Sequence, residues 1–162
     1  MGNIMLYHGS NIEINKVDLQ KSRITTDFGK AFYLTTSLDQ AQKWANKIAK
    51  IKSGNPIVSI FEYQENNTLN NKIFNNANYQ WLDYVVLNRL GNNINDIYDI
   101  VVGPVANDNT MPVILDYMAS SMNDNEKEAA ILRLKAFILI NQYAFKTEHS
   151  LEYLKFKGVQ NG

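Results

Sequence analysis

The stretch Asp27–Thr36, with the sequence DFGKAFYLTT, most constrains what this chain can fold into. Gly29 permits a tight turn or a close backbone approach. The aromatic and β-branched residues that follow it favour a short, half-buried strand. The polar residues from Ser37 onward read as the start of a helix. The stretch therefore predicts a turn, a strand and a helix in succession, and alternate strand residues point to opposite faces, so only one of Phe32 and Tyr33 faces a cleft.

The rest of the chain alternates between strand and helix patterns without a regular repeat. Ser37 is expected to cap a helix that runs to about Lys52, with an apolar stripe facing the core at Ala41, Trp44, Ala45, Ile48 and Ile51. Further helices are expected at 79–90, after Thr110 and at 125–139, and strands at 4–8, 57–63, 98–102, 142–147 and within 150–156, with a loop in the Asn-rich stretch 66–78. The strand at 98–102 is expected to end at Gly103-Pro104. Neither a Rossmann nor a P-loop glycine motif is present. The pattern predicts an α+β fold with small sheets around a cleft and helices outside.

Composition sets broad limits on function. The 162 residues suffice for a single domain, 1–162, and the 16 basic and 16 acidic residues cancel. That balance lacks the basic footprint of a nucleic-acid binder. No secretory signal or membrane-length apolar run is apparent, so we expect a cytoplasmic protein without a membrane partner. With no cysteine and two distant histidines, we expect no metal site.

A second motif lies at the amino end, where Tyr7-His8-Gly9-Ser10 closes the first strand. Taken alone, His8 is an ordinary residue at the edge of a core. Together with the Asp27–Thr36 stretch and Gly103-Pro104-Val105-Ala106-Asn107-Asp108, however, the motif resembles the ADP-ribosyltransferase superfamily. The resemblance is to the His-Tyr-Glu/Gln branch of diphtheria toxin and the poly-ADP-ribose polymerases. More narrowly, it is to a group of small bacterial proteins carrying YHGS, DFGxGFYxT and GPVAxD motifs.

This resemblance implies a split β-sheet sandwich with a central NAD cleft and flanking helices, NAD being a substrate. His8 would bind a ribose hydroxyl, Gly9 would offer backbone groups to the nicotinamide carboxamide, Ser10 would assist, and Tyr33 would stack on the nicotinamide. We expect the His8 imidazole and the Tyr33 phenol to share one pocket. The two motifs imply further NAD contacts from Tyr7, Phe28, Gly29 and Thr35. Where the group has a second glycine, this chain has Ala31.

Two arginines are candidates for the NAD diphosphate, because a guanidinium pairs bidentately with phosphate. Arg23 is the better placed, just before the central turn. Arg89, near the end of a predicted helix, could equally bind free carbonyl groups there.

The third position of the triad is a glutamine. Asn141-Gln142-Tyr143 resembles the strand on which the superfamily usually carries a catalytic glutamate. A fixed negative charge would stabilise the oxocarbenium-like centre formed when nicotinamide leaves. Gln142 can anchor a ribose hydroxyl but has no charge and cannot act as a base. Asp99 and Glu148 are possible substitutes, and each is also typical of an ordinary solvated carboxylate. Asp108, in a motif that is also typical of a strand-ending turn, is a further candidate without a defined role.

These observations predict an NAD-dependent mono-ADP-ribosyltransferase that modifies a macromolecule, with protein favoured over nucleic acid as the acceptor. The narrower group suggests the toxin of a bacterial toxin–antitoxin pair. Two alternatives stay open: an NAD glycohydrolase, which would release free ADP-ribose, and a degenerate NAD- or ADP-ribose-binding module, which would release no nicotinamide. Gln142 is the residue that separates them.

Overall fold

The computed structural model describes residues 2–23, 26–92 and 96–161, in which strands and helices alternate irregularly along the chain. The elements are β1 (Asn3–Ser10), the 3-10 helix η1 (Leu19–Lys21), β2 (Phe32–Thr35), α1 (Leu38–Lys52), β3 (Ile57–Gln64), β4 (Asn71–Ile73), α2 (Tyr79–Arg89), β5 (Ile100–Val105), α3 (Met111–Ala119), α4 (Asp124–Leu134), β6 (Ile140–Phe145), α5 (Glu148–Leu151) and β7 (Leu154–Asn161). The α+β class expected from the sequence is confirmed.

The strands form one mixed sheet with the order β4-β5-β6-β2-β1-β3-β7. All neighbouring strands are antiparallel except β4 and β5. The joint between β1 and β2 is narrow, because Tyr7 opposite Thr35 is its single register pair among the described residues. We call this joint the seam. It connects a β1–β3–β7 half to a β2–β6–β5–β4 half, so the expected small sheets are two halves of one continuous sheet.

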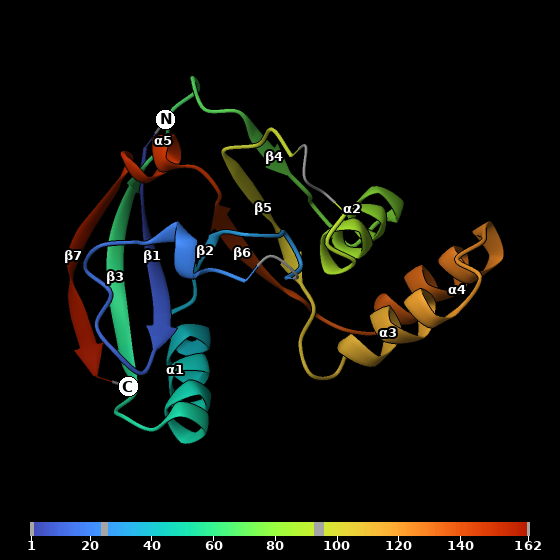
Figure 1. The fold of residues 1–162 in the computed structure, drawn as a ribbon, viewed down its shortest axis with the longest axis horizontal. Helices are drawn as coiled ribbons and strands as arrows, with labels where there is room; N and C mark the ends of the chain where they lie inside the picture. Colours follow the sequence, from blue (N-terminus) through green and yellow to red (C-terminus); the bar gives the residue numbers. More distant parts are fainter. Residues whose placement is uncertain (1, 24–25, 93–95, 162) are drawn as a thin grey trace.

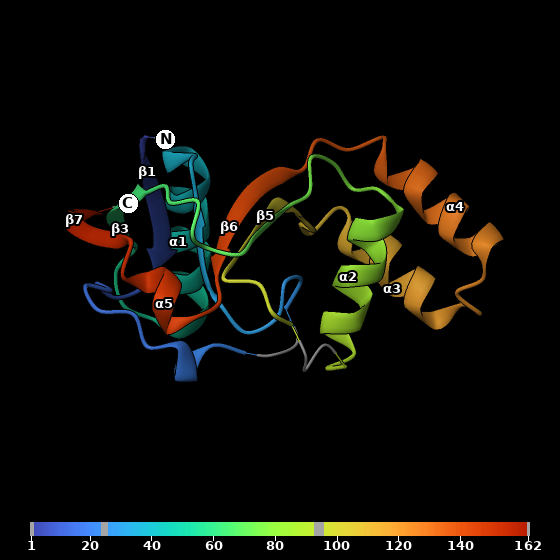
Figure 2. The ribbon, with the colours of Figure 1, turned by 90° about the horizontal axis from the view of Figure 1, so that it is seen from above.

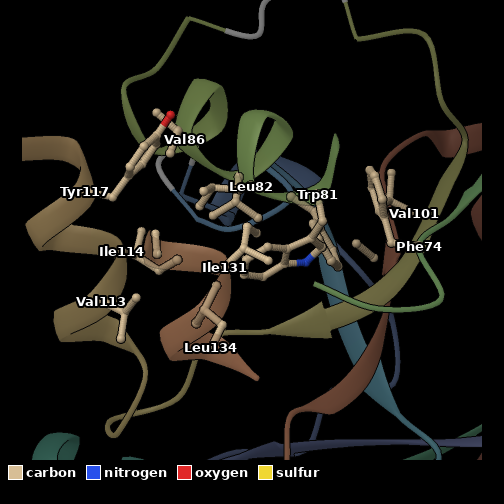
Figure 3. Close-up of a cluster of buried hydrophobic side chains, with 14 of the residues drawn as sticks. Phe74, Trp81, Leu82, Val86, Val101, Val113, Ile114, Tyr117, Ile131 and Leu134 are labelled. Carbon is tan, nitrogen blue, oxygen red and sulfur yellow. The ribbon is translucent and has the colours of Figure 1, made fainter. Parts of the chain in front are cut away.

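The helices are distributed unequally between the two halves (Figures 1 and 2). Helix α1 lies against the β1–β3–β7 half, whereas α2, α3 and α4 gather at the end of the molecule that is farthest from β7. Trp81 of α2 is fully buried among side chains from α3 and α4 (Figure 3), and its Nε1 donates to the carbonyl of Pro104 at 2.7 Å. The apolar pattern predicted for α2 is confirmed, since Leu82, Val85 and Val86 are also buried.

Helix α1 begins where the sequence predicts, because the Ser37 hydroxyl accepts from the backbone N–H of Gln40 at 3.2 Å. Its predicted stripe is partly wrong. Ala41 and Ala45 are buried, but the side chains of Trp44 and Ile51 are 48% and 67% exposed. The reason is a close backbone approach: a Cβ on Gly9 would lie 2.1 Å from the carbonyl oxygen of Ala41. Only the narrow alanine face of the helix can lie this close to β1.

Several predicted boundaries differ from the structure, and the strand expected at 142–147 is β6 at Ile140–Phe145. Strand β5 continues through Gly103-Pro104 to Val105. Proline is tolerated there because, among the described residues, β4 pairs only with residues 100–102, so no strand pairs with Pro104 on that side. Helix α4 ends at Leu134, five residues before the expected Leu139. The chain leaves it through tighter i→i+3 turns, with the N–H of Phe137 donating to the carbonyl of Leu134 at 3.1 Å.

The short elements were predicted unevenly. The turn of helix and edge strand expected within 150–156 correspond to α5 and β7. Strand β4 was not predicted, because the Asn-rich stretch 66–78 lacks the alternating apolar residues of a half-buried strand. It forms because its backbone pairs with that of β5 in parallel.

Candidate functional site

The turn at Asp27–Lys30 is held by charged groups that lie far away in the sequence. Asp27 is only 4% exposed, and its carboxylate accepts from the Arg89 Nε and from the backbone N–H of Ala106, each at 2.7 Å. A buried carboxylate is tolerated only when it is paired in this way. Arg89, one of the two arginines proposed for the NAD diphosphate, is therefore engaged in holding the turn.

Lys146, directly after β6, holds the same turn from the other side. Its ammonium donates to the carbonyl of Phe28 and pairs with Asp96 at 3.1 Å, and the side chains of both charged residues are less than a tenth exposed. Burial lowers the pKa of Lys146, and the charge of Asp96 partly opposes that shift. Asp96 also accepts from the Tyr84 hydroxyl, whose pKa is raised, first by burial and then by this carboxylate.

The phenol of Tyr33 forms hydrogen bonds with the backbone of the same turn. Its hydroxyl accepts from the backbone N–H of Phe28 at 3.0 Å, donates to the carbonyl of Gly29 at 2.7 Å and lies 2.8 Å from the Thr26 hydroxyl. Burial raises the pKa of Tyr33, so the group stays protonated and keeps its donor. Tyr33 thus connects β2 to the turn that precedes it.

His8 lies at the seam. Its Nδ1 is 2.7 Å from the backbone carbonyl of Tyr33, and its ring stacks on Phe32 with centroids 4.3 Å apart. Burial lowers the pKa of His8, which favours the neutral ring. Because a carbonyl oxygen can only accept, Nδ1 carries the proton, and Nε2 of the neutral ring keeps its lone pair. His8 therefore presents a hydrogen-bond acceptor suited to a hydroxyl group.

The expectation that His8 and Tyr33 share one pocket is wrong. Phe32 and Tyr33 are consecutive in β2 and point to opposite faces of the sheet. His8 stacks on Phe32, whereas the Tyr33 ring packs with Phe28 on the other face, 6.4 Å between centroids. The imidazole meets the backbone of Tyr33 and not its phenol. The alternation of side chains along each strand puts the two rings on opposite faces. The sequence of the two motifs did not show which residues of the first strand share a face with Tyr33.

Gln142 lies on the strand next to β2. It pairs with Thr35 on one side and with Gly103 on the other, while Thr35 pairs with Tyr7 across the seam. Since directly opposite residues share a face, these four form a row across β1, β2, β6 and β5, which we call the central row. Within the described part of the chain, the Gln142 amide has no hydrogen-bond partner. The hydroxyl of Thr35 accepts from the N–H of Ser37 at 3.1 Å.

The remaining residues of the two motifs have different surroundings. Phe28 is fully buried in the core cluster, so its predicted contact with NAD is not supported by its position. Gly29 has a φ of 80°, and a Cβ there would lie 2.7 Å from Asn88 Oδ1. The Ser10 hydroxyl is 3.4 Å from Asn11 Oδ1. Arg23 is exposed, at the end of the described segment 2–23.

The three candidate acids, Asp99, Asp108 and Glu148, do not lie beside Gln142. Asp99 accepts from the N–H of Asn70 at 2.8 Å and from the Thr147 hydroxyl at 2.6 Å, so it ties the start of β4 to α5. Asp108 is 87% exposed and pairs with Lys47 of α1 at 3.1 Å. Glu148 is exposed at the first position of α5. None of them has a described contact with the central row, so none takes the place of the missing glutamate there.

Sequence reasoning missed the groups that hold the turn: Asn88, Asp96 and Lys146. Asn88 Nδ2 donates to the carbonyl of Asp27 at 3.2 Å. One signal was available in the sequence. Asp27 directly precedes Phe28 and Gly29, and an aspartate that is buried with such neighbours needs a cation nearby. The partner cannot be chosen without the fold, since Lys146 lies 118 residues from Phe28.

Comparison with known proteins places the chain in a family. Residues 4–156 match the family model described as "Protein of unknown function (DUF3990)". The chain belongs to the DUF3990 family. The match spans β1 to β7 and includes every residue of the seam and the central row. No curated protein and no solved structure matched the chain. In the described residues of this DUF3990 protein, no helix is both long and apolar enough to cross a membrane.

Proposed function

We propose that this DUF3990 protein is an NAD-dependent mono-ADP-ribosyltransferase whose NAD site is the seam between β1 and β2. The observation that carries the proposal is the order β6-β2-β1 at the centre of the sheet. It makes neighbours of the three strands that carry the His8, Tyr33 and Gln142 motifs. These motifs lie far apart in the sequence and gave the resemblance to the transferases.

The seam itself offers the chemistry that NAD requires. The β1–β2 register consists of Tyr7 with Thr35, so the β2-facing backbone of residues 8–10 lies outside that ladder. Backbone donors and acceptors of this kind suit the planar carboxamide of nicotinamide. In this proposal Gly9 holds the carboxamide. His8, whose ring lies on the face opposite Tyr7, positions the seam through its hydrogen bond to the carbonyl of Tyr33.

Tyr33 has a different role from the one that the resemblance implies. Its phenol is engaged in the Thr26–Gly29 turn, so we propose that it positions β2 and does not stack on nicotinamide. Tyr7 is the partly buried aromatic residue of the central row. It pairs with Thr35 of β2, which in turn pairs with Gln142 of β6. Tyr7 and Gln142 share the face of the sheet opposite His8, and on that face we assign the ring contact to Tyr7 and the ribose contact to Gln142.

Gln142 supplies no charge, so the reaction relies on the acceptor's own nucleophile. The nicotinamide–ribose bond breaks, nicotinamide leaves with the bonding electron pair, and the acceptor atom forms the new bond to ribose C1′ as it loses its proton. We place the reaction in the cytoplasm and favour a protein acceptor, with an antitoxin protein as a partner.

Incubation of the protein with labelled NAD and a bacterial lysate tests the proposal. Wild type should label a macromolecule. His8→Gln and Gln142→Ala should each lower the rate of labelling at least about tenfold, because the loss of one group that supports the transition state commonly costs this much or more. Lys157→Ala, on the exposed edge of β7, is the matched control and should label as wild type does. Equal labelling in all four proteins would overturn the proposal.

The same assay separates the two alternatives. Release of nicotinamide and free ADP-ribose without a labelled macromolecule would identify a glycohydrolase. Binding of NAD without any release of nicotinamide would identify a degenerate binding module. In that case Gln142→Glu, which restores a carboxylate to the central row, is the variant in which turnover should be sought.

A further inference from the structure

A cavity lies away from the seam, between the beginning of α2 and the end of α4. It measures about 620 Å³ and is lined by residues 75–79, by Pro104 and Asn141, and by residues that run from the end of α4 toward β6. This volume falls within the range of about 300–1,000 Å³ that small-molecule sites occupy. Neither His8 nor Tyr33 nor Gln142 lines it, so the proposed NAD site does not account for it.

The cavity combines aromatic rings with carboxamides. Tyr79 and Phe137 line it, with exposed fractions of 49% and 39%. Asn75, Asn76 and Asn141 also line it, and their amides have no side-chain hydrogen-bond partner among residues 2–23, 26–92 and 96–161. Aromatic rings are platforms for the faces of nucleobases, and a carboxamide offers a donor and an acceptor together, as the edge of a base requires. The lining therefore matches a heterocyclic base on both its face and its edge.

The charge of the cavity matches one phosphate. Lys135 lines it, and its described lining holds no aspartate or glutamate. Lys135 makes no ion pair with any other described residue, so its charge is available to an anion. A single lysine meets one phosphate, so only one nucleotide of a longer strand would lie in the cavity. One base with one phosphate is the ligand that these groups fit.

We infer that this cavity binds a nucleoside 5′-monophosphate unit, with its base against Tyr79 and Phe137 and its phosphate on Lys135. The inference goes beyond the proposed function, since it requires neither NAD nor catalysis. The unit can come from a free nucleotide or from an unpaired base in a single strand. The two sources share this chemistry and differ in how many phosphates they bring.

Titration with adenosine 5′-monophosphate (AMP), followed by calorimetry without NAD, tests the inference. We expect a Kd tighter than about 1 mM, weakened at least about fivefold by Phe137→Ala and by Tyr79→Ala through loss of a stacking face. Lys135→Ala should weaken AMP but leave adenosine unchanged, because only AMP carries the phosphate. Leu132→Ala is the matched control, since this residue of α4 is 69% exposed and does not line the cavity.

Further arms identify the source and separate this inference from the proposed function. A ten-residue oligo(A) that binds more tightly than AMP identifies a single strand, and the reverse order identifies a free nucleotide. His8→Gln should not change AMP binding. The inference is overturned if AMP fails to bind at 5 mM, a ceiling of about five times the expected Kd. It is equally overturned if the cavity variants bind AMP as wild type does, or if His8→Gln weakens AMP while Phe137→Ala does not.

Discussion

The two halves of the sheet are stabilised in different ways. In the β1–β3–β7 half, α1 lies on the sheet through Ala41 and Ala45, which pack against Val58, and through its close approach to Gly9. In the β2–β6–β5–β4 half, large side chains from three helices surround Trp81. The β1–β3–β7 half depends on small residues that allow the backbones of α1 and β1 to approach closely. The β2–β6–β5–β4 half depends on the volume of large buried side chains. The seam between them carries His8, where one side chain bonds across to the neighbouring strand.

The largest expected loss of stability is in the β2–β6–β5–β4 half, which depends on large buried side chains. Trp81→Ala removes a fully buried ring and the donor to the carbonyl of Pro104, so we expect a loss near the upper end of about 3–5 kcal/mol in the free energy of unfolding. Urea unfolding measures it. The matched control is Trp44→Ala, at the other tryptophan, which should change stability by less than about 0.5 kcal/mol because that ring is 48% exposed. A large loss at Trp44 would contradict the exposed position of this residue.

A smaller loss is expected when the turn at Asp27 loses its cation. Arg89→Met leaves the Asp27 carboxylate buried without its guanidinium partner. Breaking a buried pair costs about 3–5 kcal/mol, and we expect about 2–3 here because the Arg89 side chain is 22% exposed. The double variant Asp27→Asn with Arg89→Met should recover part of this loss in urea unfolding. Simple additivity of the two single losses would show that the pair is not coupled.

The half that depends on close backbones should be sensitive to one methyl group. Gly9→Ala places a Cβ 2.1 Å from the carbonyl oxygen of Ala41, so α1 must move away from β1. We expect a loss of about 1–3 kcal/mol, as for overpacked cores. Gly2→Ala is the control, because a Cβ there meets nothing within 4 Å. If Gly9→Ala leaves the thermal midpoint unchanged, the close approach of α1 is not as the structure describes it.

The smallest effect concerns the seam and depends on pH. Because burial lowers the pKa of His8 in the folded state, the unfolded chain binds more protons once the pH falls below about 6.5, the ordinary value for histidine. The His8 contribution to stability is therefore complete above that pH and is lost as the pH falls toward the lowered folded pKa. Urea unfolding from pH 7.5 to pH 5 should show this loss in wild type, and His8→Gln should reduce it.

His149→Gln is the control for that experiment, since this histidine is 53% exposed on α5. It should retain the wild-type dependence on pH. A pH profile that His149→Gln flattens and His8→Gln leaves unchanged would contradict the buried position of the seam histidine.

Local signals in the sequence predicted much of the fold. The cap at Ser37 and the apolar spacing around Trp81 placed α1 and α2 correctly, because these signals act within a few residues. The exposed position of Trp44 was missed because it depends on how closely α1 meets Gly9, a contact between separate elements. Strand β4 was missed for a similar reason, since it depends on pairing with β5.

The candidate site could be predicted only in part. The motifs around His8, Tyr33 and Gln142 each lie on a strand, and the structure makes those strands neighbours. Their relative faces could not be predicted, because the face of a strand residue changes with every shift of one position. The groups that hold the turn, Arg89 and Lys146, come from elements 62 and 118 residues away from their partners, and no local pattern marks them.

Amide hydrogen exchange with and without NAD tests the central claim most directly, because it reports which half of the molecule NAD contacts. The account predicts that NAD slows exchange at residues 6–10 of β1, with smaller changes at β2 and around Gln142 and none in α3. Slower exchange confined to residues 75–79 and the end of α4, or no change at any position with saturating NAD, would contradict an NAD site at the seam.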